Sequence, residues 1–385
     1  MSRSCRTLCL LGLLLASLLK AQENGTGEWR KAEPGWKYDF PADHGPHRNF
    51  KTEWWYATGN LVDAQGQEFG FQLTFFRQGI RPGEKPSTAS RFRMMELPFA
   101  HFGFTDVSGK TFRHYEDSSR GAYGEAGFGT PGKEGGRMAW MRDWVIEQRP
   151  DGSFHLKAKG INGARSSGGD HGPAVERSID LILTPDHPPL IHGHDGISPK
   201  SSKPDHASHY YSLTGLRASG TVTLNGKAHA VKGIVWFDHE WATNSLESGE
   251  AGWDWSGLHL SNGSDLMLFR IRDASGRPVF LSGTLRDAQG GVTDLQDLGM
   301  TPMGSWKSPH TGGIYPAGFG ILIPSKHLSL TLTPKLPDQE LVVAPFAYWE
   351  GAVRGAGKSG SDSVTAEGYL ELTGYGGTVV GVNGK

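Results

Sequence analysis

The sequence predicts an all-β protein made of antiparallel barrels or sandwiches. Two observations carry this prediction, the composition and the spacing of strand signals. The 385 residues include 55 Gly and 10% aromatic residues, a composition typical of turn-rich β-sheet. Short alternating segments recur along the chain with turn signals between them and no helical periodicity. Evenly spaced short strands of this kind favour barrels or sandwiches.

The expected elements follow one another along the chain. Residues 68–77 (EFGFQLTFFR) alternate Phe69, Phe71, Leu73 and Phe75 on one face of a strand, which is the pattern of a half-buried strand. The other expected strands and turns are a hairpin over residues 144–159 around Pro150-Asp151-Gly152, strands at 328–333 and 368–375, and turns at 63–66, 225–226 and 262–263.

The length predicts two domains or one large β domain. The segment from residue 184 to residue 209 is rich in Pro, Gly, Ser and His and has no periodicity. We expect it to connect the two domains. The predicted organisation is an N-terminal β domain over 22–185, a linker over 186–209 and a C-terminal β domain over 210–385. A short echo between residues 54–61 (WWYATGNL) and 253–260 (WDWSGLHL) favours two related β units.

The N-terminus is typical of an export signal. Arg3 and Arg6 precede an apolar stretch from Leu8 to Leu19, which is too short to span a bilayer. Cleavage after Ala21 would remove residues 1–21 and, with them, both cysteines of the chain. We therefore expect a periplasmic or secreted protein with no disulfide and no membrane span in its mature chain.

Charge and missing motifs exclude several function classes. The net charge of −1 is mixed along the chain, which argues against nucleic acid as a partner. The sequence contains no Gly-x-Ser-x-Gly elbow, no phosphate-binding glycine loop and no dinucleotide fingerprint. Protein partners cannot be read from the sequence.

The most informative segment is residues 233–244 (GIVWFDHEWATN), which reads as a β-strand. Three consecutive ionisable residues lie inside it, and their burial is unfavourable unless they are paired or used. Because side chains alternate along a strand, His239 and Trp241 share one face, and Asp238 and Glu240 share the other. One interpretation is an acid–base pair in an aromatic pocket, where the pKa of a carboxylic acid rises. The other is a strand end whose charges meet water or basic partners.

Four aromatic clusters are candidate pocket walls. They are residues 54–56, 210–211, 253–255 and 348–350, and three of them carry or adjoin a carboxylate, from Glu53, Asp254 or Glu350. Aromatic faces stabilise apolar ligands and cations, although aromatic residues also fill ordinary β cores. The candidate ligand-binding residues are Trp54, Trp55, Tyr56, Tyr211, Trp236, Trp253, Trp255, Trp349 and Glu350.

Histidines are concentrated in the linker. His192-Gly193-His194 has a spacing that could chelate a metal on a strand. The surrounding Gly and Pro residues instead favour a loop with exposed histidines, so no metal site is predicted. The five histidines of this segment are His187, His192, His194, His206 and His209.

Several motifs together resemble the AttH group, the superfamily of carotenoid 1,2-hydratase (hydroxyneurosporene synthase). The resemblance runs from about residue 36 to 376, and its motifs are 51–61 (KTEWWYATGNL), 188–190 (PPL) with 192–193 (HG), 210–212 (YYS), 236–241 (WFDHEW), 252–255 (GWDW) and 368–375 (GYLELTGY).

The resemblance implies two lipocalin-like antiparallel β-barrel domains packed together, a site for a hydrophobic small molecule, and no obligatory metal or organic cofactor. It also assigns catalysis to a His-x-Trp element that matches His239 and Trp241, and an acidic position near Asp254. Fungal relatives of similar fold catalyse cycloadditions, so the fold does not determine the reaction.

The leading hypothesis is an exported protein that binds a lipid- or isoprenoid-like molecule and acts on it as a hydratase or hydrolase. Asp238, Asp254 or His239 would donate a proton, with His239 as the base for water. The indole rings of Trp236, Trp241 and Trp253 would stabilise positive charge. One alternative is a non-catalytic carrier or chaperone of a lipophilic ligand. Another is a structural scaffold whose function is to join the two barrels, with the pocket filled by side chains.

Overall fold

The computed structural model describes residues 28–83, 90, 92–133, 136–161, 176–201, 206–244, 246–247, 249–343 and 346–376. The predicted signal over residues 1–21 lies outside these ranges. The described residues form β-strands and two short 3₁₀ turns, η2 (Ala42–His44) and η4 (Pro324–Lys326), with no α-helix among them. In this part of the chain no helix has the length and apolar character needed to cross a membrane.

The first sheet is antiparallel and has the order β4-β3-β2-β1-β13-β12-β9-β8-β7-β6-β5, with β10 and β11 also paired to β12. Its strands are β1 (Thr52–Asp63), β2 (Glu68–Gly79), β3 (Glu96–Asp106), β4 (Thr111–Ser118), β5 (Ala126–Phe128), β6 (Arg137–Met141), β7 (Trp144–Gln148), β8 (Phe154–Ile161), β9 (Glu176–Pro185), β10 (Leu190–Ile191), β11 (Ser198–Pro199), β12 (Ala207–Leu224) and β13 (Lys227–Ala242).

The second sheet has the order β17-β16-β15-β14-β25-β24-β22-β21-β18, with β23 paired to β24, and β19 pairs with β20 separately. Its strands, with that pair, are β14 (Glu250–Leu260), β15 (Asp265–Asp273), β16 (Pro278–Arg286), β17 (Val292–Leu295), β18 (Gly299–Pro302), β19 (Trp306–Lys307), β20 (Ile314–Tyr315), β21 (Phe319–Ile323), β22 (Leu328–Pro334), β23 (Glu340–Val343), β24 (Phe346–Ser359) and β25 (Asp362–Thr373).

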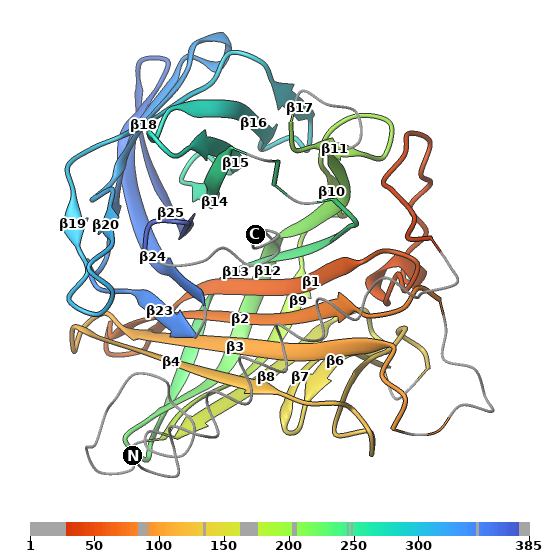
Figure 1. The fold of residues 1–385 in the computed structure, drawn as a ribbon. Helices are drawn as coiled ribbons and strands as arrows, with labels where there is room; N and C mark the ends of the chain where they lie inside the picture. Colours follow the sequence, from red (N-terminus) through yellow and green to blue (C-terminus); the bar gives the residue numbers. More distant parts are fainter. Residues whose placement is uncertain are drawn as a thin grey trace.

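Both sheets curl, and Figure 1 shows the second, from teal to blue, above the first, from red to green. Each encloses its own apolar core, one built around Phe71 and Phe102 and the other around Leu268 and Leu332. A third apolar cluster, with Trp236 and Trp255 in it, lies between the sheets. The prediction of an all-β protein with two antiparallel barrels is confirmed.

The two sheets share one strand plan. In the first, β1 lies between β2 and β13, and in the second β14 lies between β15 and β25. The echoed segments 54–61 and 253–260 fall in β1 and β14, so they hold equivalent places. The internal similarity in the sequence therefore corresponds to equivalent strands in the fold.

The individual strands agree with their sequence patterns. Phe69, Phe71, Leu73 and Phe75 of β2 are all buried in the first core. The expected hairpin is formed by β7 and β8, and β22 alternates buried and exposed residues. At the turn before β13, Asn225 and Gly226 both have positive φ, as a two-residue hairpin turn requires.

The chain passes from the first sheet to the second after Ala242. Strands β12 and β13 pair with β9 and β1, so residues 210–242, assigned above to the C-terminal domain, are hydrogen-bonded into the first sheet. The expected linker also contributes β10 and β11, which pair with β12. β12 and β13 are long because both of their faces are buried at one end, against the first core and against the second sheet.

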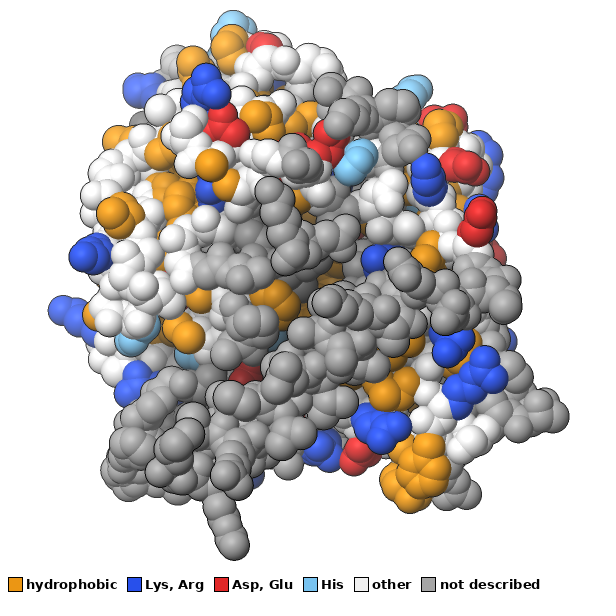
Figure 2. All heavy atoms as spheres, in the orientation of Figure 1, with side chains coloured by type: hydrophobic (Ala, Val, Ile, Leu, Met, Phe, Trp, Pro, Cys, Tyr) orange, Lys and Arg blue, Asp and Glu red, His pale blue; other side chains and the backbone are white. Residues whose placement is uncertain are grey.

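The expectation of exposed loop histidines is wrong for His192 and His209. Both are almost completely buried, because β10 and β11 hold the segment against β12. The imidazole of His192 stacks on Tyr210 at 4.1 Å and contacts Ser212 Oγ at 2.6 Å. On the face drawn in Figure 2, acidic and basic side chains are interspersed over the described surface, consistent with the near-zero net charge.

Candidate functional site

The ionisable run of β13 is divided between two places. Asp238 and Glu240 point from the first sheet toward the second, whereas His239 and Trp241 point into the first barrel, as the alternation of a strand requires. All four side chains are buried. The same strand therefore supplies two polar sites, which we describe in turn.

The first site is a pocket between the two sheets, and it is lined by side chains from β1, β2, β13, β14, β15, β24 and β25, among others. Aromatic rings make up much of its wall. They are Trp54, Tyr56, Phe76, Phe99, Tyr210, Trp253, Trp255, Phe269, Phe346 and Tyr348.

Carboxyl groups reach this pocket from both sheets. Asp238 and Glu240 come from β13, Glu350 from β24 and Glu371 from β25. Glu240 is neutralised by Lys200, whose Nζ lies 2.8 Å from Glu240 Oε1. Among the described residues, no basic side chain forms an ion pair with the other three carboxyl groups, and Asp238, Glu350 and Glu371 instead accept hydrogen bonds from neutral donors.

Asp238 is surrounded by donors on its own sheet. The indole N–H of Trp236 donates to Oδ1 at 2.7 Å, the hydroxyl of Tyr210 donates to Oδ2 at 2.8 Å, and the hydroxyl of Ser212 also donates to Oδ1. Trp255 from the second sheet donates to the Tyr210 oxygen at 3.0 Å. Hydrogen bonds thus connect the two sheets at this carboxyl group.

Glu350 and Glu371 lie directly opposite each other on neighbouring strands. Tyr56 donates its hydroxyl proton to Glu350 Oε1 at 2.6 Å, and Trp253 donates its indole proton to Glu371 Oε1 at 3.0 Å. Two charged carboxylates in this arrangement would repel each other. The second oxygen of Glu350 is buried without a hydrogen-bond partner.

Burial favours the protonated form of all three groups. It raises the pKa of Asp238 to about 7, against the opposing hydrogen bonds from Ser212 and Tyr210. It raises the pKa of Glu371 to about 8, with Trp253 opposing and Asp238 adding to the rise. Burial, with the neighbouring Glu371, also holds the pKa of Glu350 well above its usual range. The pocket therefore contains carboxylic acids that keep a proton near neutrality.

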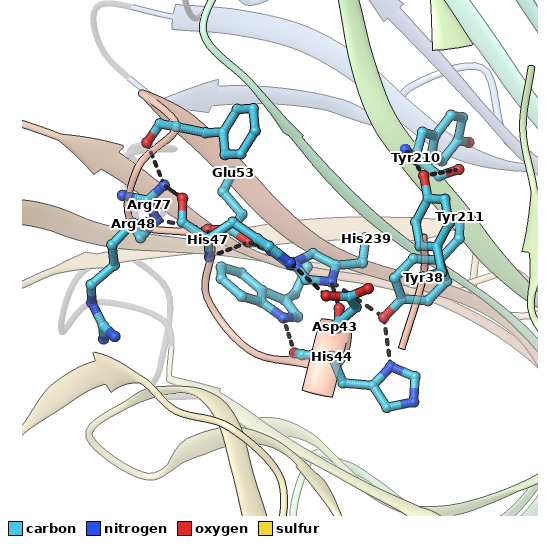
Figure 3. A network of polar contacts seen from close by, with 12 residues as sticks. Tyr38, Asp43, His44, His47, Arg48, Glu53, Arg77, Tyr210, Tyr211 and His239 are labelled. Atoms are coloured by element: carbon cyan, nitrogen blue, oxygen red, sulfur yellow. Dashed lines mark hydrogen bonds and ion pairs between the residues drawn. The ribbon is translucent and has the colours of Figure 1, made fainter. Parts of the chain in front are cut away.

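The second site is a network inside the first barrel, centred on the fully buried Glu53 and His239, with His47 partly exposed (Figure 3). Glu53 Oε1 lies 2.8 Å from His47 Nδ1 and 3.0 Å from His239 Nε2, and Arg77 Nε donates to Oε2 at 2.8 Å. Trp241 does not bond to Glu53 but stacks on His47, with ring centroids 3.7 Å apart. The network joins β1, β2 and β13 to the segment that precedes β1.

The electrostatics of this network favour an ionised Glu53. Burial acts to raise the pKa of Glu53, but Arg77 and the two imidazoles hold it well below its usual range. Burial likewise acts to lower the pKa of His47, yet hydrogen bonds to Asp43 and Glu53 raise it. The pKa of His239 is lowered by burial, with Glu53 opposing. These three residues bring one donor atom each within 4.8 Å of one another.

The structure distributes the predicted site residues over three places. The pocket receives Asp238, Trp54, Tyr56, Trp253, Trp255 and Glu350, with Trp236 behind Asp238. The network inside the first barrel, or the core beside it, receives His239, Trp241, Trp55 and Tyr211. The interior of the second barrel receives Asp254 and Trp349.

Asp254 is placed far from the role of a pocket acid. Its Oδ2 accepts from Arg270 Nε at 2.7 Å, and its Oδ1 accepts from the Tyr375 hydroxyl at 2.9 Å. It is completely buried in this ion pair. The arrangement stabilises the second barrel and uses both oxygens of Asp254 as acceptors in its interior, away from the pocket.

Sequence reasoning did not single out Glu371, His47 or Arg77. Glu371 carried a detectable signal, because it alternates with Tyr369 on one face of a strand whose other face is Leu370 and Leu372. His47 and Arg77 carried none, since they meet Glu53 only through the tertiary fold.

Comparisons with known proteins agree with this architecture. The family model described as AttH-like matches residues 31–375. The crystal structure of a putative AttH from Nitrosomonas europaea is 31% identical, covers 90% of this chain and 99% of its own, and superposes with a TM-score of 0.76. The crystal structure of kievitone hydratase from Nectria haematococca is 14% identical, covers 92% of this chain and 97% of its own, and has a TM-score of 0.64, so it shows a shared fold. No curated protein sequence matches the chain.

Proposed function

The chain belongs to the AttH-like family, and from this premise we propose that it is an acid–base enzyme that hydrates an alkene of a hydrophobic, isoprenoid- or lipid-like molecule in the pocket between its two barrels. One observation carries the proposal. The carboxyl group of Glu371 is half-buried in an aromatic pocket, and the loss of solvent around it raises its pKa to about 8, which keeps it protonated at neutral pH. A neutral carboxylic acid in such a place is suited to proton donation.

The reaction would proceed in two steps. Glu371 gives its proton to one alkene carbon, and the adjacent carbon becomes a cation that the faces of Trp253 and Trp255 stabilise. Water then adds to the cation and loses a proton to the ionised form of Asp238, which is present at neutral pH because hydrogen bonds limit the rise of its pKa to about 7. The sum is the addition of one water across one double bond, and proton exchange with solvent restores both carboxyl groups.

The aromatic wall supports an apolar substrate. Ten aromatic residues line the pocket. Its lining also includes two basic side chains, and each is paired with a carboxylate: Arg77 with the buried Glu53, and Lys200 with Glu240. An anionic substrate would find no free cation among the described lining residues, and an aromatic surface stabilises an apolar one by burial.

The test begins with the molecule that the protein itself retains. Small molecules extracted from the purified protein are identified by mass spectrometry, and the identified alkene is incubated with the enzyme in D₂O. In D₂O the carboxyl proton of the enzyme is replaced by deuterium, so protonation of the alkene by this group forms a C–D bond in the product. We expect Glu371→Gln to slow this labelling ~10²–10⁴-fold while the molecule still binds.

The control is Glu367→Gln, which removes an exposed carboxylate four residues earlier on the same strand. It should label like the natural sequence. Labelling that survives in Glu371→Gln would contradict the role of this residue. Binding without labelling by the natural sequence would instead identify a carrier.

We also propose that the protein is exported. The basic and apolar pattern of residues 1–21 supports this, and mass spectrometry of the mature protein should find its first residue at Gln22. A mature chain that still begins at Met1 would contradict cleavage.

A further inference from the structure

We propose that His47, Glu53 and His239 bind a divalent first-row transition metal ion inside the first barrel. The three donor atoms, His47 Nδ1, Glu53 Oε1 and His239 Nε2, lie within 4.8 Å of one another and converge on one point (Figure 3). Two imidazoles and one carboxylate form a donor set that suits Zn²⁺ or Fe²⁺. This site adjoins the pocket between the sheets, whose lining includes Glu53 and Arg77, but the proposal does not depend on the chemistry of that pocket.

Hydrogen bonds on the outer side of each imidazole determine where its proton lies. His47 Nε2 is 3.1 Å from Asp43 Oδ1, and His239 Nδ1 is 3.0 Å from the backbone carbonyl oxygen of Asp43. A carboxylate and a carbonyl oxygen only accept, so each imidazole carries its proton on this outer nitrogen. The inner nitrogen of each neutral ring then presents a lone pair.

Those lone pairs point at another acceptor. His47 Nδ1 and His239 Nε2 lie 2.8 Å and 3.0 Å from Glu53 Oε1. Three electron-pair donors at such distances repel one another unless a positive charge lies between them. A metal ion would supply that charge and would use all three as ligands.

The surroundings are typical of a metal centre. Arg77 binds the other oxygen of Glu53, Oε2. The backbone N–H of His47 lies 3.0 Å from Oε1 and 2.9 Å from Oε2, so Oε1 keeps a second lone pair for a metal ion. Asp43 orients both histidines from outside, as carboxylates and carbonyls do for metal-bound imidazoles. The rings of Trp241 and Trp55 stack on His47 and His239, at 3.7 Å and 4.5 Å, and fix their planes. Three protein ligands leave one position for water in a tetrahedral site.

The competing occupant is a proton. If His47 were doubly protonated, it would donate to Asp43 and Glu53 at the same time, and no metal would be needed. The first barrel offers a matched comparison, because His229 Nδ1 lies 2.8 Å from Asp63 Oδ2 in a buried pair that has no second histidine ligand among the described residues.

The experiment measures bound metal in the full chain after growth with supplemented Zn²⁺, Fe²⁺ and Mn²⁺. We expect about one ion per chain in the natural protein and in His229→Gln. We expect less than about a tenth of that in His47→Gln and Glu53→Gln, since each loses a direct ligand. Circular dichroism checks that each variant is folded.

X-ray absorption at the metal edge of the natural protein keeps the test decisive if the variants misfold. Two imidazole nitrogens at ~2.0–2.1 Å would support the site. A folded protein that remains metal-free after refolding with each ion in turn would overturn it and leave a proton as the occupant. Metal bound without imidazole ligands, or retained equally by folded His47→Gln and Glu53→Gln, would also overturn it.

Discussion

The two sheets are alike where they face each other and different where they enclose their own cores. Tyr56 pairs with Asp238 across β1 and β13, and at the equivalent place Trp255 pairs with Glu371 across β14 and β25. Each sheet therefore presents an aromatic ring beside a carboxyl group to the shared pocket. The duplicated strand plan explains why these groups converge from both sides.

The barrel interiors show the contrast. The residue of β1 that points inward between Trp54 and Tyr56 is Trp55, which contacts His239, whereas its counterpart in β14 is Asp254, which pairs with Arg270. One barrel interior centres on a carboxylate held by two imidazoles and one guanidinium group, and the other on a carboxylate held by guanidinium groups and a tyrosine hydroxyl. The comparison teaches that the facing surfaces carry the candidate chemistry, while the interiors have separate roles.

The largest expected effect on this comparison comes from Asp254→Asn, which removes the central carboxylate of the second barrel. The change leaves Arg270 buried next to Arg272 without the carboxylate that neutralises both. We expect the free energy of unfolding to fall by about 3–5 kcal/mol, the usual effect of breaking a buried ion pair. Urea denaturation followed by Trp fluorescence measures it.

The matched control for this change is Asp273→Asn, which removes the partner of the exposed Arg277 and should have an effect below ~1 kcal/mol. Folded Asp254→Asn should still bind the pocket ligand. Equal effects of the two changes would mean that the interior ion pair of the second barrel does not stabilise it.

The pH dependence of stability sharpens the view of the pocket. The pKa of Glu371 is about 8 in the folded protein and 4.5 in its unperturbed form, so the folded state binds more protons between these values. The contribution of Glu371 to stability should be full below about pH 4.5 and should be lost as pH rises through 8. Each such proton contributes a slope of at most ~1.4 kcal/mol per pH unit.

Urea denaturation of Glu371→Gln across that pH range measures the contribution. We expect a flatter pH dependence, because the amide does not titrate. Glu367→Gln, which changes an exposed residue, should keep the slope of the natural protein. An unchanged slope in Glu371→Gln would show that this carboxyl group is already ionised at neutral pH, and the proposed proton donor would be lost.

The strands were predictable from the sequence because apolar alternation in β2 and β22 reflects burial directly. Alternation also separated His239 from Asp238 correctly. It could not tell which face of β13 meets a cavity, since one face is buried in the first barrel and the other between the sheets. A strand buried on both faces loses the polar side that orients an alternating pattern.

Convergence of distant segments was the other limit. Glu53 meets Arg77 from β2, His239 from β13 and His47 from the loop before β1. Glu350 and Glu371 become neighbours through the pairing of β24 with β25. Neither grouping has a fixed sequence spacing, so only the fold reveals it. The spacing that was visible, His192-Gly193-His194, does not form a metal site among the described residues; His192 is instead buried behind Ser212 and Tyr210, the partners of Asp238.

The smallest expected effect distinguishes two tyrosines at equivalent places. Tyr210 of β12 and Tyr348 of β24 both line the pocket. Tyr210 donates to Asp238 and accepts from Trp255, whereas among the described residues the hydroxyl of Tyr348 bonds to His101. Tyr210→Phe leaves two buried polar groups unpaired and should reduce the unfolding free energy by about 1–3 kcal/mol. Tyr348→Phe leaves one unpaired and should have the smaller effect. Urea denaturation of both variants decides the order, and an equal or larger loss in Tyr348→Phe would mean that the link between the sheets does not pass through Tyr210.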